Sequence, residues 1–180
     1  MSNIAQLVSD IANARYAFIQ QIRNIPQEKA QWKPDAETWS VVDNTEHLFW
    51  AEHGAIAGMW KTLHAIRSGE REREYESVHK NLPVEEIIAL TWQPKEKVPP
   101  VAAPRFGGPL NFWILSFEGL QKLLEVFASD LKDDELRLLA HPHPISGPMD
   151  FHQRLEFLRF HIDRHFGQVK TLVESINNNG

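Results

Sequence analysis

Four stretches of the chain carry apolar residues at the spacing of an amphipathic helix, and no stretch alternates as a strand does. The first stretch predicts a helix over residues 4–23. Its apolar stripe consists of Ile4, Leu7, Val8, Ile11, Phe18 and Ile22. Pro26 ends this helix because proline is not tolerated in a helix interior, and an irregular link over 27–38 follows.

The second helix is predicted to begin at Ser40, because Ser40 followed three residues later by Asp43 has the pattern of a capping pair. Its apolar positions are Leu48, Ile56, Met59, Leu63 and Ile66. They carry the helix to about Arg67, and Gly69 closes it.

Two further helices follow in the second half of the chain. The third is predicted over residues 110–129, and the fourth begins where Asp150 and Gln153 form a second capping pair. The fourth has the clearest stripe, made of Leu155, Leu158, Ile162, Val169, Leu172 and Ile176. The pattern therefore predicts an all-α fold, a four-helix bundle in a single domain over residues 1–180.

Residues 70–108 interrupt this pattern between the second and third helices. Residues 70–76 form a charge run, and 83–92 has the pattern of a short helix with Pro83 in its first turn. The prolines and glycines that follow exclude regular structure: Pro94, Pro99, Pro100, Pro104, Gly107 and Gly108. We interpret 70–108 as a long irregular insertion over one end of the bundle, since such loops are usually functional or mobile.

Composition narrows the function classes. The 180 residues contain 42% hydrophobic and 24% charged side chains, as in an ordinary folded domain, and the net charge of -5 argues against nucleic acid as a partner. Residues 1–14 do not resemble a signal peptide, and no apolar run approaches the roughly 20 residues of a membrane span, so we expect a cytoplasmic protein with no membrane partner. Nine histidines beside no cysteine leave imidazole and carboxylate as the available metal ligands.

Three histidines are the strongest candidates for chemistry. His161 and His165 are four residues apart on the fourth helix, which places them one turn apart with about 5–6 Å between Cβ atoms. Such a pair alone is more often a pair of hydrogen-bonded histidines at the edge of a core. His47, beside the apolar stripe of the second helix, supplies a third ligand if the two helices match in depth. Gln168 shares this side of the fourth helix.

Three protein ligands and an open position form the pattern of catalytic zinc sites, where the metal activates a bound water. Nickel tolerates the same imidazoles, whereas iron and manganese suit them less well. A zincin protease is excluded, since its motif requires glutamate where Ile162 stands. A carboxylate-bridged di-iron bundle requires two inward Glu-x-x-His units, and the single instance, Glu76 with His79, lies in a polar segment.

These residues together resemble the DinB-like superfamily, also described as DinB/YfiT-like metal-dependent hydrolases. The motifs that carry the resemblance are Trp39-Ser40, Glu46-His47-Leu48, His143-Pro144 with Gly147-Pro148, and His161-Ile162-Asp163-Arg164-His165 with Gln168. The resemblance implies an up-up-down-down-type four-helix bundle, frequently a homodimer. It also implies a nickel- or zinc-type site at His47, His161 and His165. In some relatives the metal activates the sulfur of a low-molecular-weight thiol for transfer or isomerisation.

The remaining histidines are weaker candidates. His53 and His64 fall on other faces of the second helix, and His152 faces away from His161. His141 and His143 alternate with Pro142 and Pro144, where a rigid turn is a better interpretation than a ligand pair.

Few other side chains suggest a catalytic role. Asp43, one turn before His47, either caps its helix or holds the histidine ring. Asp163 and Arg164 project toward solvent or a partner. Four tryptophans line a pocket or belong to the core: Trp50, Trp60, Trp92 and Trp113. No residue stands out as a general base.

Two classes of function fit these observations. In the first, which we favour, the protein is an enzyme whose three-histidine metal site activates a water or a thiol against a small-molecule substrate, under the 70–108 insertion. It is then a metal-dependent hydrolase or a thiol-dependent S-transferase or isomerase. In the second, the bundle is a non-catalytic metal-binding or dimerisation module, an alternative kept open by the lack of an acid or base partner.

Overall fold

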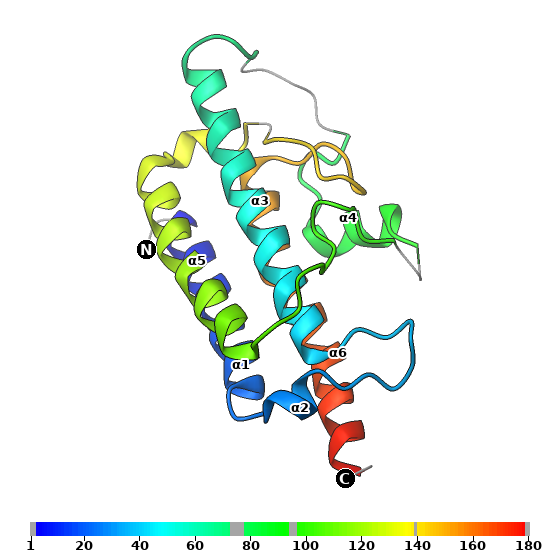
Figure 1. Ribbon diagram of the computed structural model, residues 1–180. Coiled ribbons are helices and arrows are strands. Elements are labelled where there is room, and N and C mark those ends of the chain that lie inside the picture. Colours follow the sequence, from blue (N-terminus) through cyan, green and yellow to red (C-terminus); the bar gives the residue numbers. More distant parts are fainter. Residues whose placement is uncertain (1–2, 73–77, 94–96, 139, 179–180) are drawn as a thin grey trace.

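The computed structural model describes residues 3–72, 78–93, 97–138 and 140–178, and these residues form helices and no strand (Figure 1). The predicted all-α fold class is confirmed. The elements in chain order are α1 (Asn3–Ile22), α2 (Gln27–Ala30), α3 (Val41–Arg67), α4 (Val84–Thr91), α5 (Leu110–Asp130), the 3-10 helix η1 (Asp133–Glu135) and α6 (Phe151–Asn178). The capping pairs set the helix starts as expected.

The N-terminus of α3 shows how local sequence fixes an element boundary. The Ser40 hydroxyl accepts a hydrogen bond from the Asp43 backbone N–H at 3.1 Å, and the Asp43 carboxylate accepts one from the Ser40 N–H at 2.9 Å. Asp150 and Gln153 make the same reciprocal pair before α6. Both pairs satisfy backbone donors that a helix start leaves free.

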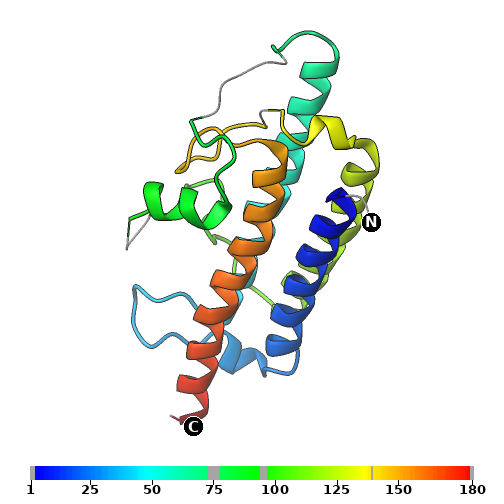
Figure 2. The ribbon, with the colours of Figure 1, turned by 180° about the vertical axis from the view of Figure 1, so that it is seen from behind.

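The directions of the long helices correct the up-up-down-down topology. Figures 1 and 2 show α1 and α6 running one way and α3 and α5 running the other way, an up-down-down-up order. His47 lies against His161 and Asn44 against His165, so α3 and α6 are antiparallel. Because α3 and α5 are parallel, the chain between them must travel back along the bundle.

The returning segment, residues 68–109, is called the crossover here. Within it, α4 packs beside α6 rather than over an end of the bundle, which corrects the predicted position of the insertion (Figure 2). A second apolar cluster holds it there: Val84, Ile87, Ile88, Met149 and Phe157. Pro83 is the N-cap of α4, one position before its first turn.

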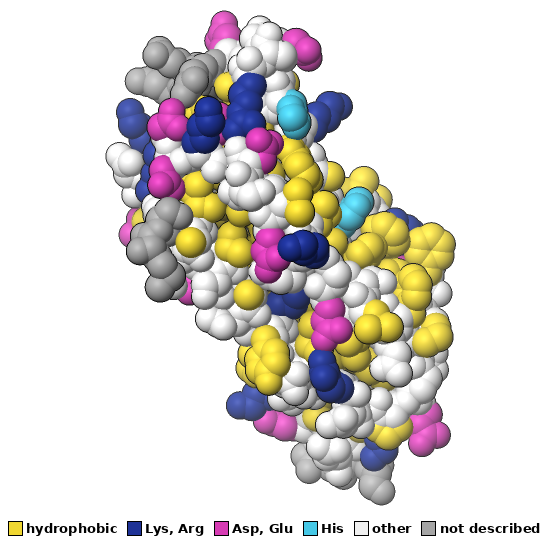
Figure 3. All heavy atoms as spheres, turned by 90° about the vertical axis from the view of Figure 1, so that its left-hand side faces the viewer, with side chains coloured by type: hydrophobic (Ala, Val, Ile, Leu, Met, Phe, Trp, Pro, Cys, Tyr) yellow, Lys and Arg dark blue, Asp and Glu magenta, His cyan; other side chains and the backbone are white. Residues whose placement is uncertain are grey.

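Two smaller features complete the fold. The predicted irregular link after α1 contains the four-residue helix α2. Figure 3 shows a face on which lysine and arginine side chains are interspersed with carboxylates, without a basic stripe among the described residues. No helix in the described part of the chain has the length and hydropathy of a membrane span.

Candidate metal centre

His47 on α3 and His161 and His165 on α6 converge in the interior of the molecule. All three side chains are buried, and one ring nitrogen of each lies within 4.8 Å of the others. The Nε2 atoms of His47 and His161 are 3.1 Å apart. The antiparallel packing of α3 and α6 therefore places His47 at the same level along the bundle as His161 and His165.

Hydrogen bonds turn two of the rings toward the centre. His47 Nδ1 donates to the carbonyl oxygen of Ala102 at 2.8 Å, and His165 Nδ1 donates to Asn44 Oδ1 at 2.8 Å. The Asn44 amide is itself oriented, since its Nδ2 donates to the Ser40 carbonyl at 2.8 Å. Because both ring partners are acceptors, Nδ1 carries the proton and Nε2 keeps its lone pair free.

The donor set fits one divalent cation. Two nitrogens at about 2.1 Å from a tetrahedral zinc ion are roughly 3.4 Å apart, close to the 3.1 Å between the Nε2 atoms of His47 and His161. Burial lowers the pKa of all three histidines, strongly for His161 and His165, whose neighbouring histidine and arginine charges add to the effect. The rings are thus neutral at physiological pH, the form that binds metal.

Aromatic side chains enclose the three rings. Trp39 stacks over His165, with ring centroids 6.1 Å apart and planes inclined by 11°, and it also contacts His47. Phe157 stacks on His161 at 5.5 Å and 18°. These contacts hold the imidazole rings between aromatic side chains in the interior of the molecule.

Glu46 attaches the crossover to α3 beside the histidines. Its carboxylate is fully buried and accepts hydrogen bonds from the backbone N–H groups of Arg105, Phe106 and Gly107, at 2.8–2.9 Å for the shortest bond from each. Trp50 Nε1 donates a fourth bond at 3.2 Å. The neighbouring residue His47 also binds the crossover, through the Ala102 carbonyl. Two adjacent residues of α3 therefore hold the crossover in place.

A cavity of about 920 Å³ opens onto the three histidines, between α3, α6 and the crossover. Trp50 and Trp92 line it, whereas Trp113 belongs to the core and Trp60 donates a hydrogen bond to Asp130 on α5. Its volume suits a small molecule. The pocket interpretation therefore holds for Trp50 and Trp92, and the core interpretation holds for Trp113 and Trp60.

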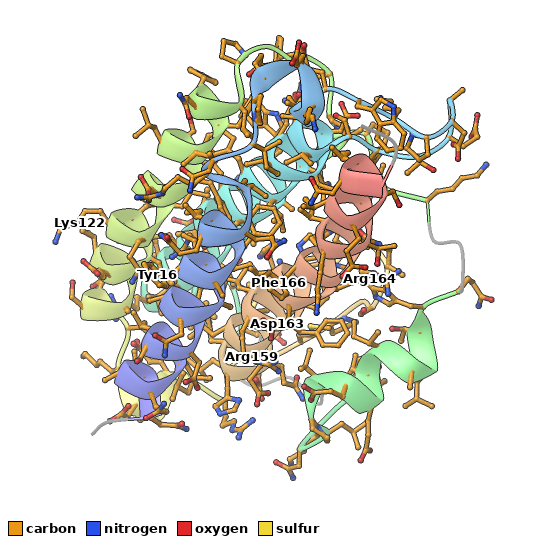
Figure 4. All side chains as sticks on the ribbon, turned by 90° about the horizontal axis from the view of Figure 1, so that it is seen from below. Tyr16, Lys122, Arg159, Asp163, Arg164 and Phe166 are labelled. Atoms are coloured by element: carbon orange, nitrogen blue, oxygen red, sulfur yellow. The ribbon has the colours of Figure 1, made fainter. Side chains whose placement is uncertain are left out.

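Asp43 and Asp163 lie apart from the histidine cluster, whereas Arg164 lines the cavity that opens onto it. Asp43 caps α3 and pairs with Lys33 at 2.6 Å, whereas the Nδ1 atom of His47 is hydrogen-bonded to the Ala102 carbonyl. Asp163 is exposed and pairs with Arg159, and Arg164 leaves α6 on another side, over the ring of Trp92 (Figure 4). Asp43 is therefore a cap.

The other histidines are distributed as follows. His53 and His64 are exposed on α3, and His152 lies 3.3 Å from Glu156. His143 closes a tight turn with Gly147 through two backbone hydrogen bonds of 2.8 and 2.9 Å. His141 and His143 also line the cavity. Of the pair considered for a di-iron site, His79 binds the Ser146 carbonyl, and Glu76 lies outside the described residues.

No role at the site was predicted from the sequence for Asn44, for Arg154, which lines the cavity, or for Glu46, which was named only as part of a motif. Asn44 lies three positions before His47, on the same side of the helix, which was an available signal. Arg154 lies seven positions before His161, so the helical period places a charged residue on the inward face of α6. Ala102 could not be found, because it contributes only a backbone carbonyl.

Comparison with known proteins agrees with this architecture. No curated protein matches the chain. The sequence profile of the DinB superfamily matches residues 11–169, a span that includes all three histidines and the crossover. The chain belongs to the DinB superfamily.

Proposed function

We propose that His47, His161 and His165 bind one zinc or nickel ion, and that the protein is a metal-dependent enzyme acting on a small molecule. The observation that carries the proposal is the convergence of three buried, neutral imidazoles at the wall of a cavity of about 920 Å³. Three protein ligands leave a coordination position open for a nucleophile or substrate. Bound there, the metal would lower the pKa of a water or a thiol and polarise a substrate oxygen.

The protein's own residues orient and enclose the site. Ala102 and Asn44 fix the ring tautomers of two ligands, and Trp39 and Phe157 pack against the rings of His165 and His161. Glu37, which is exposed, is the only carboxylate among the described residues that line the cavity. A hydrolase here would therefore act without a buried carboxylate as general base.

The same observation favours a thiol as the second candidate nucleophile. A thiol that coordinates a metal loses its proton outright, so it needs no neighbouring base. The cavity has room for a low-molecular-weight thiol beside a substrate. The second candidate function is thus a thiol-dependent S-transferase or isomerase.

We also propose a cytoplasmic homodimer. Phe112 and Leu115 are 57% and 67% exposed on α5, on the opposite side of that helix from its core residues. The two side chains are three residues apart on one face of the helix, and contiguous exposed apolar surface is the feature that marks contacts between proteins. Light scattering coupled to gel filtration tests the dimer, and a monomeric mass would reject it.

Metal content is the first test. Plasma mass spectrometry on untagged protein should find about one zinc or nickel per chain in the wild type and in His53→Ala, and none in His161→Ala. The control removes an exposed histidine of α3. If the wild type stays metal-free after reconstitution with both ions, the proposed site is wrong.

Activity tests then separate the two nucleophiles. The metallated protein is assayed with ester and amide substrates, and in parallel with thiols and electrophiles. Turnover that requires a thiol and His161 supports the transferase, and thiol-independent hydrolysis supports the hydrolase. If the fully metallated protein catalyses neither reaction faster than free metal ions do, it is a non-catalytic metal-binding module.

A further inference from the structure

Arg154, in the first turn of α6, is a buried arginine with almost no hydrogen-bond partners. Its side chain is 3% exposed and lines the same cavity as the three histidines. Nε and Nη1 have no hydrogen-bond partner, and Nη2 makes one contact, 3.3 Å from His141 Nε2. An arginine has five N–H donors, so most of this group's hydrogen-bonding capacity is unused.

No carboxylate among the described residues pairs with Arg154. Asp150, one turn away, pairs instead with Arg137 at 3.1 Å. Arg15, the other buried arginine among the described residues, lies against the carboxylate of Glu52. Burial lowers the pKa of Arg154 to about 10, which leaves the guanidinium charged at neutral pH. A buried, unpaired charge is costly, so a group that binds it from outside the chain would be stabilising.

The charges around the cavity favour an anion. Arg164 and Lys97 also line it, against the single exposed carboxylate of Glu37. His141 and His143 contribute no charge, because burial and the nearby Arg154 lower their pKa values to about 4 and about 3. The cavity is thus cationic before any metal is bound.

The spacing along α6 relates Arg154 to the candidate metal centre. Arg154 precedes His161 by seven residues, two helical turns, so their Cα atoms are about 10 Å apart on one face. Phe157 lies between them: the guanidinium carbon is 5.6 Å from its ring centroid, and its ring stacks on His161. An apolar surface therefore connects the unpaired arginine with the histidines.

We propose that Arg154 binds the anionic group, a carboxylate or a phosphate, of a small substrate whose apolar body lies along Phe157 and whose other end reaches the three histidines. The position of the reacting end rests on the proposed metal function. The anion subsite does not depend on the metal, because it is formed by Arg154 and other side chains of the protein itself. The two ideas can therefore fail separately.

The test uses the metal-free, full-length protein and isothermal titration calorimetry with three probes of one shape: hexanoate, hexyl phosphate and uncharged hexanamide. Arg154→Gln removes the charge. Arg159→Gln is the matched control, since Arg159 is on the same helix but outside the cavity, paired with Glu85 and Asp163 (Figure 4). Circular dichroism and thermal unfolding establish that each variant is folded. Uptake of zinc and of nickel is measured in parallel on each protein.

At least one anion should bind the wild type and Arg159→Gln with similar affinity, and should bind Arg154→Gln about tenfold or more weakly. Its affinity for the wild type should exceed that of hexanamide by a similar factor. Whichever anion binds more tightly identifies the substrate class. Equal affinity in folded Arg154→Gln, or no anion binding to the wild type, would overturn the subsite. Anion binding in a protein that takes up neither zinc nor nickel would retain the subsite and reject the metal function.

Discussion

A pair of glycines on α3 provides a sharp test of how the cavity is built. A Cβ added at Gly58 would lie 2.7 Å from His141 Cε1 and 2.8 Å from both ring nitrogens, whereas a Cβ at Gly54 meets nothing within 4 Å. Both positions are inside the same helix. The imidazole of His141, which contacts Arg154, therefore packs directly on the α3 backbone where a side chain is missing.

The magnitudes follow from two opposing effects. Glycine to alanine inside a helix stabilises by about 1 kcal/mol, and this gain applies to Gly54→Ala and Gly58→Ala alike. Overpacking at Gly58 opposes it by about 1–3 kcal/mol, because the whole ring of His141 must move. Gly54→Ala should therefore raise the free energy of unfolding by about 1 kcal/mol. The free energy of unfolding of Gly58→Ala should be about 1–3 kcal/mol lower than that of Gly54→Ala.

Urea unfolding followed by circular dichroism measures both values, with thermal unfolding as a second probe. The difference corresponds to a gap in Tm of roughly 2–4 °C per kcal/mol for a chain of this size. If Gly58→Ala is stabilised as much as Gly54→Ala, His141 does not pack on α3 and the described cavity wall is wrong.

Three further predictions concern single side chains. Asn44→Ala should weaken zinc binding about 10- to 100-fold, as competition with a chelator would show, because His165 loses the acceptor that orients its ring; unchanged affinity would contradict that role. The pKa of His141 is about 4 in the fold against 6.5 in the unfolded chain, so the unfolded state binds the extra proton between these values. Stability of the metal-free protein should therefore fall as pH is lowered through this window, and His141→Gln should make the slope shallower by about 1.4 kcal/mol per pH unit, measured by urea titration from pH 7 to 4. Arg154→Met should stabilise the unliganded protein by about 1–3 kcal/mol, since it removes an unpaired buried charge, and a loss of stability would show that the charge has a partner.

Local signals made the helices predictable. The Ser40–Asp43 pair begins α3, and the apolar stripe on either side of His161 and His165 turns these rings inward. Such features depend on residues three or four positions apart, which the sequence displays directly. The convergence of His47 with the pair on α6 was predicted only on the condition that the two helices match in depth. The apolar stripes turn these histidines inward, but the depth match depends on how α3 packs against α6.

Long-range features were less accessible. The up-up-down-down order was wrong, because helix directions depend on how the crossover returns and not on any local pattern. The placement of 70–108 over an end of the bundle failed for the same reason. Glu46 was hidden because its partners are backbone N–H groups some 60 residues away, at Arg105, Phe106 and Gly107.

The attachment of the crossover to α3 has a thermodynamic consequence. Glu46 holds the backbone of residues 105–107, and His47 is kept in its metal-binding tautomer by the carbonyl of Ala102 in the same segment. Docking of the crossover and binding of the proposed metal ion would therefore be linked equilibria, each strengthening the other by the same factor. Slower amide exchange at Phe106 and Gly107 would then serve as a gauge of metal loading. Conversely, a ligand that opens the crossover to enter the cavity would loosen the ion at the moment of entry.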